Sequence, residues 1–461
     1  MQYIDFLKQK VVRHQPAGFC TKQVNPKLFN WQEPIVKWAL KLGSAALFEE
    51  CGLGKTPQQL SFAHEVSKAE GRPVLILAPL AVASQTKREG KKFDIDVNIA
   101  EMQADIKPGI NITNYEKLDK FDAKHFSGIV LDESSILKSY MGKTKRLICE
   151  KFKDTPYKLA CTATPAPNDL MELLNHAEFL NIMRSSEALS VWFITDQSCG
   201  GKYKLKGHAV KDFWQWVSSW SICIEKPSDI GFSDEGYILP KLNEMDMILG
   251  VNEFSDDFED GLFRNIDMSA TGFYKEKSRT VKIRAKKCAE IATSVNEQFT
   301  IWCNTNEEAD MLKKSLPEAV EIRGSDSIQK KEDAAIGFID GNIRILISKS
   351  SIFGFGLNFQ NCHNSIHCGL NYSYEEYYQT VRRHYRFGQQ HEVNIYRVLG
   401  STEKNILDTL AKKEKQKEAM TLGMSTHMKE FQTANLSGHA FKLNLNNHDV
   451  EIPSWLRSES A

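Results

Sequence analysis

The stretch Glu49–Thr56, EECGLGKT, is the most informative part of the sequence. The apolar run Ala45–Glu50 leads into it and has the composition expected of a buried strand. The segment that follows, Thr56–Glu70, places its apolar residues on one face of a helix and stops before a Gly-Arg-Pro sequence. A strand, a glycine-rich loop ending in Gly-Lys-Thr, and a helix form a phosphate-binding loop. Glu49 stands where the strict pattern has glycine, but the second half of the pattern, Gly52-x-Gly54-Lys55-Thr56, is intact.

A loop of this kind holds the phosphates of a nucleotide. We expect the backbone N–H groups of Gly52, Leu53 and Gly54 to surround a phosphate, helped by the dipole of the helix that follows. Lys55 would then reach the β- and γ-phosphates of ATP, and Thr56 would hold Mg²⁺. The alternative is a glycine turn followed by a chance Lys-Thr pair.

A second motif combines an apolar strand with two acids. Ile129–Ser135, IVLDESS, should emerge at the carboxyl edge of a parallel sheet, where open α/β sheets bind ligands. We expect Asp132 to complete the Mg²⁺ site and Glu133 to orient or activate the attacking water. The alternative is a pair of acids that caps the next helix.

Short runs rich in β-branched residues alternate with helical patterns along the chain, which predicts an α/β fold. They form two series, and their continuous apolar character favours strands buried on both faces of parallel sheets. We predict a first lobe over 1–180, an inserted, partly helical, Trp-rich region over 181–298, a second lobe over 299–418 and an accessory tail over 419–461. The predicted strands are Ala45–Glu50, Val74–Leu80, Ile110–Asn114, Ile129–Asp132, Lys158–Thr162, Phe299–Asn304, Ile343–Ser348 and Val393–Val398.

Composition limits the classes of function. Lys+Arg and Asp+Glu both number 59, so the net charge of zero argues against a polycationic binder but not against a local basic groove. The ten cysteines include no C-x-x-C pair, which favours a reducing compartment over a disulfide scaffold. The sequence has no run of about 18 apolar residues and no signal-peptide pattern, so we expect a cytoplasmic protein with no membrane partner.

Several motifs in order resemble the superfamily 2 helicase-type ATPases, and more narrowly the Swi/Snf-type DNA-dependent ATPases in their compact, phage- or prophage-type form. EECGLGKT resembles that family's DEMGLGKT, which also lacks the first glycine. Phe29-Asn30-Trp31-Gln32 is similar to the glutamine motif that reads adenine. The further matching stretches are ILAPLAVASQTKRE (Ile76–Glu89), ITNYEKL (Ile112–Leu118), LDESSILKS (Leu131–Ser139), ACTATPAPNDLMEL (Ala160–Leu173), GFGLNFQ (Gly354–Gln360) and QTVRRHYRFGQ (Gln379–Gln389). The last of these is similar to the family pattern QAxDRAxRxGQ.

This resemblance implies two RecA-like lobes on either side of an ATP cleft. It assigns Gln32, Gly356 and Gln379 to the nucleotide site, and Arg383 and Arg386 to the γ-phosphate. The spacing of Gln379, Arg383 and Arg386 would place all three on one face of a helix. The implied function is an ATP-dependent motor on nucleic acid, most simply a monomer that translocates on double-stranded DNA, with protein partners unknown. A strand-separating DNA or RNA helicase and a non-hydrolysing nucleic-acid-binding scaffold remain open as alternatives.

The sequence departs from the family pattern in two places. Ser134 and Ser135 replace the Ala-His that usually follows the acid pair, so the link between the acids and the next motif should use another contact. The stretch Gly369–Ser373 replaces an acidic stretch of the family, which weakens the inference of DNA contacts there.

Clusters outside these motifs have two interpretations each. The basic residues after the second predicted strand contact a DNA backbone or form a solvated helix face; they are Lys87, Arg88, Lys91 and Lys92. A second basic set near Tyr203 could also touch nucleic acid; it comprises Lys202, Lys204 and Lys206. CHNSIHC at Cys362–Cys368 reads as part of a buried strand rather than a zinc site. Trp214, Trp216 and Trp220 favour the core of the inserted region.

Overall fold

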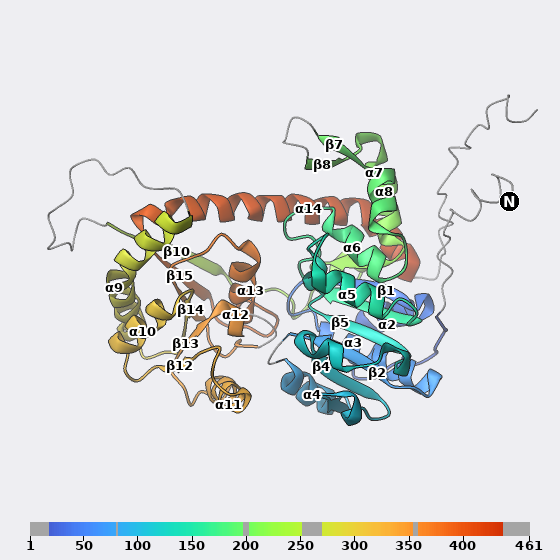
Figure 1. The fold of residues 1–461 in the computed structure, drawn as a ribbon, viewed down its shortest axis with the longest axis horizontal. Helices are drawn as coiled ribbons and strands as arrows, with labels where there is room; N and C mark the ends of the chain where they lie inside the picture. The colour runs from blue at the N-terminus through green and yellow to red at the C-terminus, as the bar shows by residue number, and fades with distance from the viewer. Residues whose placement is uncertain (1–17, 80–81, 197–201, 251–269, 354–357, 437–461) are drawn as a thin grey trace, which may run out of the picture.

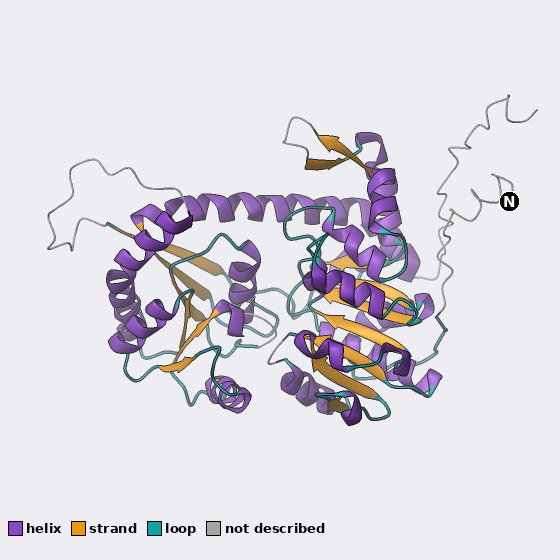
Figure 2. Cartoon of the chain, viewed as in Figure 1, coloured by secondary structure: helices purple, strands orange, loops and turns teal. Residues whose placement is uncertain are grey.

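The computed structural model describes residues 18–79, 82–196, 202–250, 270–353 and 358–436. These residues form two α/β lobes that lie side by side and are bridged by one long helix (Figure 1). In each lobe, helices pack on both faces of a sheet (Figure 2). Among the described helices, none is both long and apolar enough to cross a bilayer.

The first lobe is built on a seven-stranded parallel sheet, in the order β3-β4-β2-β5-β6-β1-β9. Its central strands are buried along nearly their whole length, because helices cover both faces. The strands that precede the phosphate loop and the acid pair, β1 and β5, are separated only by β6, so their carboxyl ends meet at one edge of the sheet. The strands are β1 (Ser44–Glu49), β2 (Val74–Ala78), β3 (Val97–Ile99), β4 (Ile110–Asn114), β5 (Gly128–Asp132), β6 (Tyr157–Thr162) and β9 (Ser221–Ile224).

Two hydrophobic cores sandwich this sheet. One core gathers residues of the glutamine-motif helix and of the helix after the phosphate loop, and the other gathers the helices that follow the acid pair. The helices of the first lobe are α2 (Gln32–Leu42), α3 (Lys55–Glu70), α4 (Ala83–Lys92), α5 (Lys143–Lys151), α6 (Glu172–Phe179), α7 (Ser185–Trp192) and α8 (Val210–Ser218).

The second lobe contains a six-stranded parallel sheet, in the order β10-β15-β14-β11-β13-β12. The predicted α/β architecture with two parallel-sheet lobes is therefore confirmed. The strands are β10 (Leu242–Leu249), β11 (Phe299–Cys303), β12 (Val320–Ile322), β13 (Ile345–Lys349), β14 (Asn364–Cys368) and β15 (Val393–Gly400). The helices are α9 (Ala270–Ser294), α10 (Asn306–Ser315), α11 (Ile328–Ile339), α12 (Ser350–Phe353) and α13 (Tyr374–His384).

The segment predicted as an inserted region contributes strands to both lobes. β9 pairs with β1 at the edge of the first sheet, and β10 pairs with β15 at the edge of the second. Trp214, Trp216 and Trp220 are buried as expected, but in a core of the first lobe, where the centres of the Trp220 and Phe48 rings lie 6.0 Å apart in a T-shaped arrangement. The described residues of 181–224 are therefore packed as an extension of the first lobe. Only a short antiparallel hairpin, β7 (Phe193–Asp196) with β8 (Lys202–Leu205), projects beyond α7 and α8 (Figure 1).

The predicted boundary between the second lobe and the tail falls inside a helix. α14 (Lys404–Leu436) continues through residues 418 and 419 and runs from the second lobe back to the first (Figure 1). Met424, Met428 and Gln432, four residues apart, are buried, and both methionines belong to a core of the first lobe. This four-residue repeat is the sequence signal for the helix that the weak overall periodicity concealed.

Candidate nucleotide site between the lobes

The phosphate loop has a backbone that only glycine adopts easily. Gly52 and Gly54 have φ angles of 92° and 74°, in the left-handed region that disfavours other residues. A Cβ atom at Gly54 would lie 2.5 Å from Nε2 of Gln32, and one at Gly52 would lie 2.7 Å from the backbone nitrogen of Phe387. The two glycines thus allow the glutamine-motif helix and the second lobe to approach the loop closely.

Lys55 begins α3 at the mouth of this loop. Its Nζ donates hydrogen bonds to the carbonyl oxygens of Glu49 (2.7 Å) and Glu50 (3.2 Å), so the ammonium group lies over the loop. Thr56 is the second residue of the helix and is half-buried. The helix N-terminus with a lysine and a threonine in its first turn is an arrangement suited to phosphate and Mg²⁺.

Gln32 is fully buried and joins the glutamine motif to the phosphate loop. Its Nε2 donates to the carbonyl oxygen of Leu53 at 2.8 Å, and its Oε1 accepts from the backbone N–H of Phe29 at 3.1 Å. The side chain that was predicted to read adenine therefore supports the loop in this structure, and its reading of a base remains a prediction.

The two acids lie beside the loop at the ends of adjacent elements. Asp132 ends β5, and its Oδ1 accepts a hydrogen bond from Nε2 of Gln59 at 2.9 Å, while its carbonyl accepts from the hydroxyl of Tyr115 at 2.8 Å. Glu133 has a φ angle of 59°, unusual for a residue other than glycine, which turns its carboxylate towards Thr162 of the following motif. Burial raises the pKa of both carboxyl groups, and the Lys55 ammonium opposes that shift.

The contact that replaces the missing histidine is visible at Ser134. Nε2 of His176, from α6, lies 3.1 Å from the Ser134 hydroxyl, and its Nδ1 lies 3.2 Å from the Glu172 carbonyl. Because that carbonyl can only accept, Nδ1 carries the proton and the serine donates to Nε2. Burial lowers the pKa of His176 to about 4, which keeps the ring neutral. Neither His176 nor Gln59 was identified from the sequence, because each lies far along the chain from its partner.

The second lobe reaches the same acids across the cleft. Nε2 of Gln379 lies 3.4 Å from Oε2 of Glu133, and Arg383 donates from Nη2 to Oε1 of Gln379 at 2.8 Å. These two residues share a face of α13 as predicted. The helix ends at His384, however, so Arg386 lies in the loop beyond it, and the prediction that it shares the helical face is wrong.

Arg386 nevertheless lies against the phosphate loop. Its Cβ is 3.4 Å from the place where a Cβ on Gly52 would be, and within the described part of the chain its guanidinium makes no hydrogen bond or ion pair. Burial and the neighbouring Arg383 lower the pKa of Arg386 to about 10, so the guanidinium stays protonated at neutral pH. An unpaired cation beside a phosphate loop is suited to receive a phosphate. Gly356, the other predicted residue of the second lobe, lies outside the described residues.

These residues fit ATP and Mg²⁺. The glycine cradle is closed to larger side chains, Lys55 and Arg386 leave charge available for phosphate, and Asp132 and Thr56 supply the oxygen ligands that Mg²⁺ prefers. One oxygen of Glu49 and one of Gln59 are buried without a hydrogen-bond partner among the described residues, so the site has two acceptor atoms that can still receive a hydrogen bond.

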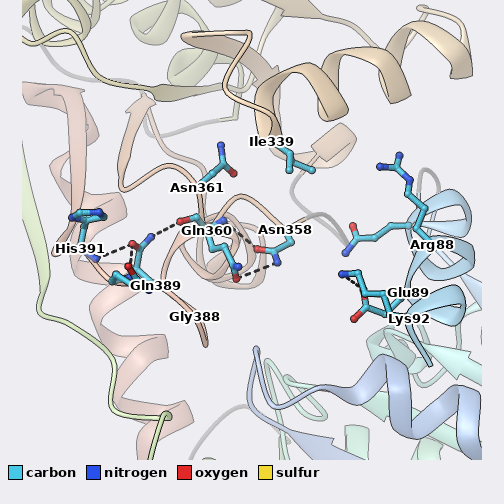
Figure 3. Close-up of a pocket in the computed structure, with 12 residues that line it drawn as sticks. Arg88, Glu89, Lys92, Ile339, Asn358, Gln360, Asn361, Gly388, Gln389 and His391 are labelled. Atoms are coloured by element: carbon cyan, nitrogen blue, oxygen red, sulfur yellow. Dashed lines mark hydrogen bonds and ion pairs between the residues drawn. The ribbon is translucent and has the colours of Figure 1, made fainter. Parts of the chain in front are cut away.

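A second feature of the cleft is a cavity of about 570 Å³ between α4 and the second lobe (Figure 3). Arg88 and Lys92 line it from the first lobe, and both are exposed. The second lobe contributes amide and imidazole side chains, namely Asn358, Gln360, Asn361, Gln389, Gln390 and His391. Of the predicted basic sets, the one on α4 is therefore partly directed into the cleft. Lys204 and Lys206 lie on the projecting β7–β8 region, and the Lys206 Nζ bonds the carbonyls of Ser190 and Val191.

The segment Cys362–Cys368 packs in the hydrophobic interior of the second lobe. β14 is buried along its whole length, Cys362 Sγ lies 3.2 Å from the Gln298 carbonyl, and His363 pairs with Glu297 at 3.1 Å. The interpretation as a buried strand is confirmed.

Comparison with known proteins finds two domains in order. Residues 31–200 match the SNF2-related domain, and residues 283–388 match the helicase conserved C-terminal domain. The ISWI chromatin-remodeling complex ATPase ISW2 of Saccharomyces cerevisiae is 30% identical over 199 residues, which cover 37% of this chain and 18% of that protein. The putative ATP-dependent helicase/translocase YwqA of Bacillus subtilis is 29% identical over 175 residues, 33% of this chain and 18% of that protein.

Among solved structures, the chain is similar to the Sulfolobus solfataricus SWI2/SNF2 ATPase core in complex with dsDNA. The two are 21% identical with a TM-score of 0.41, and the match covers 90% of this chain and 97% of the other. The matched segments span no more than 18% of the length of the two curated relatives, ISW2 and YwqA. The SNF2-related domain and the helicase conserved C-terminal domain, matched in that order along the chain, support a Swi/Snf-like ATPase of the superfamily 2 helicase type.

Proposed function

We propose that this chain hydrolyses ATP and couples hydrolysis to movement along double-stranded DNA. The observation that carries the proposal is the meeting of the two lobes at one site. Gln379 of the second lobe contacts Glu133 of the first, and the backbone at Arg386 and Phe387 packs on Gly52. Groups from both lobes are thus within reach of one nucleotide, so that nucleotide state and lobe arrangement are linked.

The side chains divide the work on ATP between them. Lys55 and the loop backbone hold the phosphates, and Gln32 ties the loop to α2. Glu133 orients the attacking water and accepts its proton, while Arg383 and Arg386 neutralise charge that develops on the γ-phosphate. Mg²⁺ held by Thr56 and Asp132 would neutralise further phosphate charge.

The nucleic acid is the second substrate in this proposal. The exposed Arg88 and Lys92, facing amide side chains across the 570 Å³ cavity, suit a sugar-phosphate backbone, which arginine, lysine, asparagine and glutamine commonly contact. Contacts of this kind read no sequence, as a translocating motor requires. The relative named as a helicase/translocase supports the same interpretation.

Parallel ATPase assays test both parts of the proposal. The hydrolysis rate is measured without nucleic acid and with single-stranded DNA, double-stranded DNA or RNA, for the wild type and for Lys55→Ala. We expect double-stranded DNA to stimulate hydrolysis most, an effect that fades with added salt because backbone binding releases counterions. Lys55→Ala should abolish hydrolysis under all conditions. Full activity of that variant would refute the assignment of the phosphate loop, and a rate indifferent to nucleic acid would favour a different role for the fold.

Strand separation is the second candidate, and the β7–β8 hairpin favours it. The hairpin projects from the first lobe (Figure 1). It carries two exposed apolar side chains, Ile194 at 49% and Tyr203 at 41%, and a side chain that separates base pairs must be exposed in this way. An assay of strand displacement on a forked duplex, beside an assay of triplex displacement on an intact duplex, separates unwinding from translocation. We also propose that the chain acts as a monomer, which light scattering with and without DNA would check.

A further inference from the structure

Glu50, the residue after β1, is a carboxylate on which three segments of the chain converge. Its side chain is 12% exposed, and its Oε1 accepts the backbone N–H of Cys51 within the phosphate loop at 2.7 Å. From the second lobe, the Tyr378 hydroxyl donates to it, and Arg382 approaches its Oε2 at 3.4 Å. From α14, Lys417 approaches the same oxygen at 3.4 Å.

The groups around Glu50 also contact each other. The Lys417 Nζ lies 3.6 Å from the centre of the Tyr378 ring, and the Arg382 guanidinium lies 5.1 Å from it. Both distances are within the range of a cation–π interaction. The ring of Tyr378 therefore contacts both cations, and its hydroxyl binds the carboxylate. Glu50, Tyr378, Arg382 and Lys417 form one cluster, which lies beside a cavity of about 170 Å³.

The carboxylate of Glu50 is charged in this setting. Burial alone would raise its pKa, but the Arg382 and Lys417 cations outweigh burial and hold the pKa well below its ordinary value. Removing one partner from such a buried ion pair leaves an uncompensated charge, which is strongly unfavourable. The cluster is therefore an interlobe contact that is strong only while all of its members are present.

The cluster lies next in sequence to the residues that act on ATP. Tyr378 precedes Gln379 and Arg382 precedes Arg383, so each cluster residue of α13 is followed by one that reaches the acid pair or its partner. We propose that Glu50 is a positioning residue that anchors α13 to the phosphate loop, orients Arg383 and Arg386 towards the γ-phosphate, and ties this arrangement to α14. The proposal rests on the proposed ATP hydrolysis.

A double-mutant cycle tests the proposal. Glu50→Gln, Arg382→Gln and the double variant are assayed for kcat and for the KM of ATP, at saturating DNA and at a temperature where each is folded by circular dichroism. Misplacement of catalytic groups by about 1 Å costs roughly 100-fold in rate, so each single variant should lose about 10- to 100-fold in kcat with little change in KM. The double variant should be no slower than the slower single one, because the Glu50–Arg382 ion pair is already lost in each single variant. Tyr378→Phe, which deletes only the hydroxyl, should show a smaller loss of the same kind.

Glu178 provides a matched control inside the first lobe. Its carboxylate also binds a lysine and a hydroxyl, those of Lys145 and Ser185, with no second-lobe partner among its described contacts. Glu178→Gln should lower the melting temperature and leave kcat unchanged.

Two results would overturn the proposal. They are wild-type kcat in Glu50→Gln and Arg382→Gln, or losses that multiply in the double variant. If either result is found while the wild type hydrolyses ATP and Lys55→Ala does not, the proposed role of Glu50 is refuted and the proposed function stands. Absence of hydrolysis by the wild type would instead refute the proposed function.

Discussion

The two lobes present their site residues in different ways. In the first lobe each of these side chains is held by neighbours of the same lobe: Gln32 by Leu53, Lys55 by the carbonyls of Glu49 and Glu50, and Asp132 by Gln59. In the second lobe, Gln379 touches the acid pair only across the cleft, and the guanidinium of Arg386 has no hydrogen-bond or ion-pair partner among the described residues. The first lobe is thus formed for binding before the lobes meet, whereas the second contributes only when they do.

The molecule thus assigns ground-state binding of ATP and acceleration of the reaction to different groups. Groups that are preorganised within one lobe can bind ATP whatever the arrangement of the lobes. Groups that arrive with the other lobe act on the rate, because they stabilise charge only when the cleft is closed. Apart from Lys55→Ala, which should abolish hydrolysis altogether, the largest effect of a substitution is therefore expected at a second-lobe arginine, and the smallest at the cations that face the nucleic acid.

Loss of Arg386 should affect the rate and spare ATP affinity. Arg386→Ala removes a guanidinium that no described residue neutralises, and arginine fingers contribute about 10³–10⁵ in rate. We expect a fall in kcat of that order with nearly unchanged ATP binding, and poor rescue by Arg386→Lys, whose ammonium lacks the planar fork. Single-turnover hydrolysis and nucleotide binding, each with and without saturating DNA, measure the two effects. If Arg386→Ala instead keeps its basal rate and only needs more DNA for stimulation, the residue contacts DNA.

Loss of the Glu133 charge should likewise separate binding from turnover within the first lobe. Glu133→Gln keeps the shape of the side chain, but one of the two oxygens that accept from Thr162 and Gln379 becomes an NH2 group, and the amide cannot accept a proton. General-base catalysis contributes about 10²–10⁴ in rate, so kcat should fall by that factor while ATP and Mg²⁺ still bind. A variant that binds ATP poorly and hydrolyses it at full rate would make Glu133 a structural residue.

The burial of Glu49 in the first lobe should measurably lower the free energy of unfolding as the pH rises. This carboxyl is fully buried with one oxygen unpaired, and burial raises its pKa from 4.5 to about 7, opposed by Lys55 and Gln58. The folded chain therefore keeps a proton that the unfolded chain loses, so stability falls as the pH rises from 4.5 to 7, by about 3 kcal/mol.

Glu49→Gln should remove that decline. The variant should gain stability relative to the wild type between pH 5 and pH 8, in denaturant titrations of both proteins at each pH. Buried neutral histidines such as His176 shift stability in the opposite direction over the same range, but they are common to both proteins and cancel in the comparison. An equal difference at pH 5 and pH 8 would show that Glu49 does not titrate in this range.

The smallest effect is expected on the α4 side of the cleft. Arg88→Ala/Lys92→Ala should weaken DNA binding several-fold and reduce the salt dependence of binding by about two charges, with the DNA-free ATPase unchanged. Lys282→Ala/Lys286→Ala removes two exposed cations from α9, on the far side of the second lobe, and should change neither (Figure 1). Equal losses in both double variants would indicate a general charge effect.

Much of the fold and of the site could be predicted from local patterns. The predicted strand Ile110–Asn114 is found with the same bounds, and that at Lys158–Thr162 gains one residue, because continuous β-branched runs between helices identify buried parallel strands. The strands β3, β7, β8, β9, β10 and β12 were missed. β3 and β12 have three residues each, and β10 has only half-buried and exposed residues, as an edge strand does.

The chemistry proposed for this protein can be predicted from short motifs of its sequence. A phosphate loop, an acid pair and an arginine-rich stretch are short motifs whose residues lie close together in the chain, so their spacing alone identifies them. Only the tertiary structure decided how these motifs meet. Arg386 lies beyond the end of its helix, His176 lies beside Ser134, and Glu50 joins Arg382 and Lys417. These contacts join residues 42 to 367 positions apart, and they exist because the strand order and α14 bring distant segments together, which local periodicity does not specify.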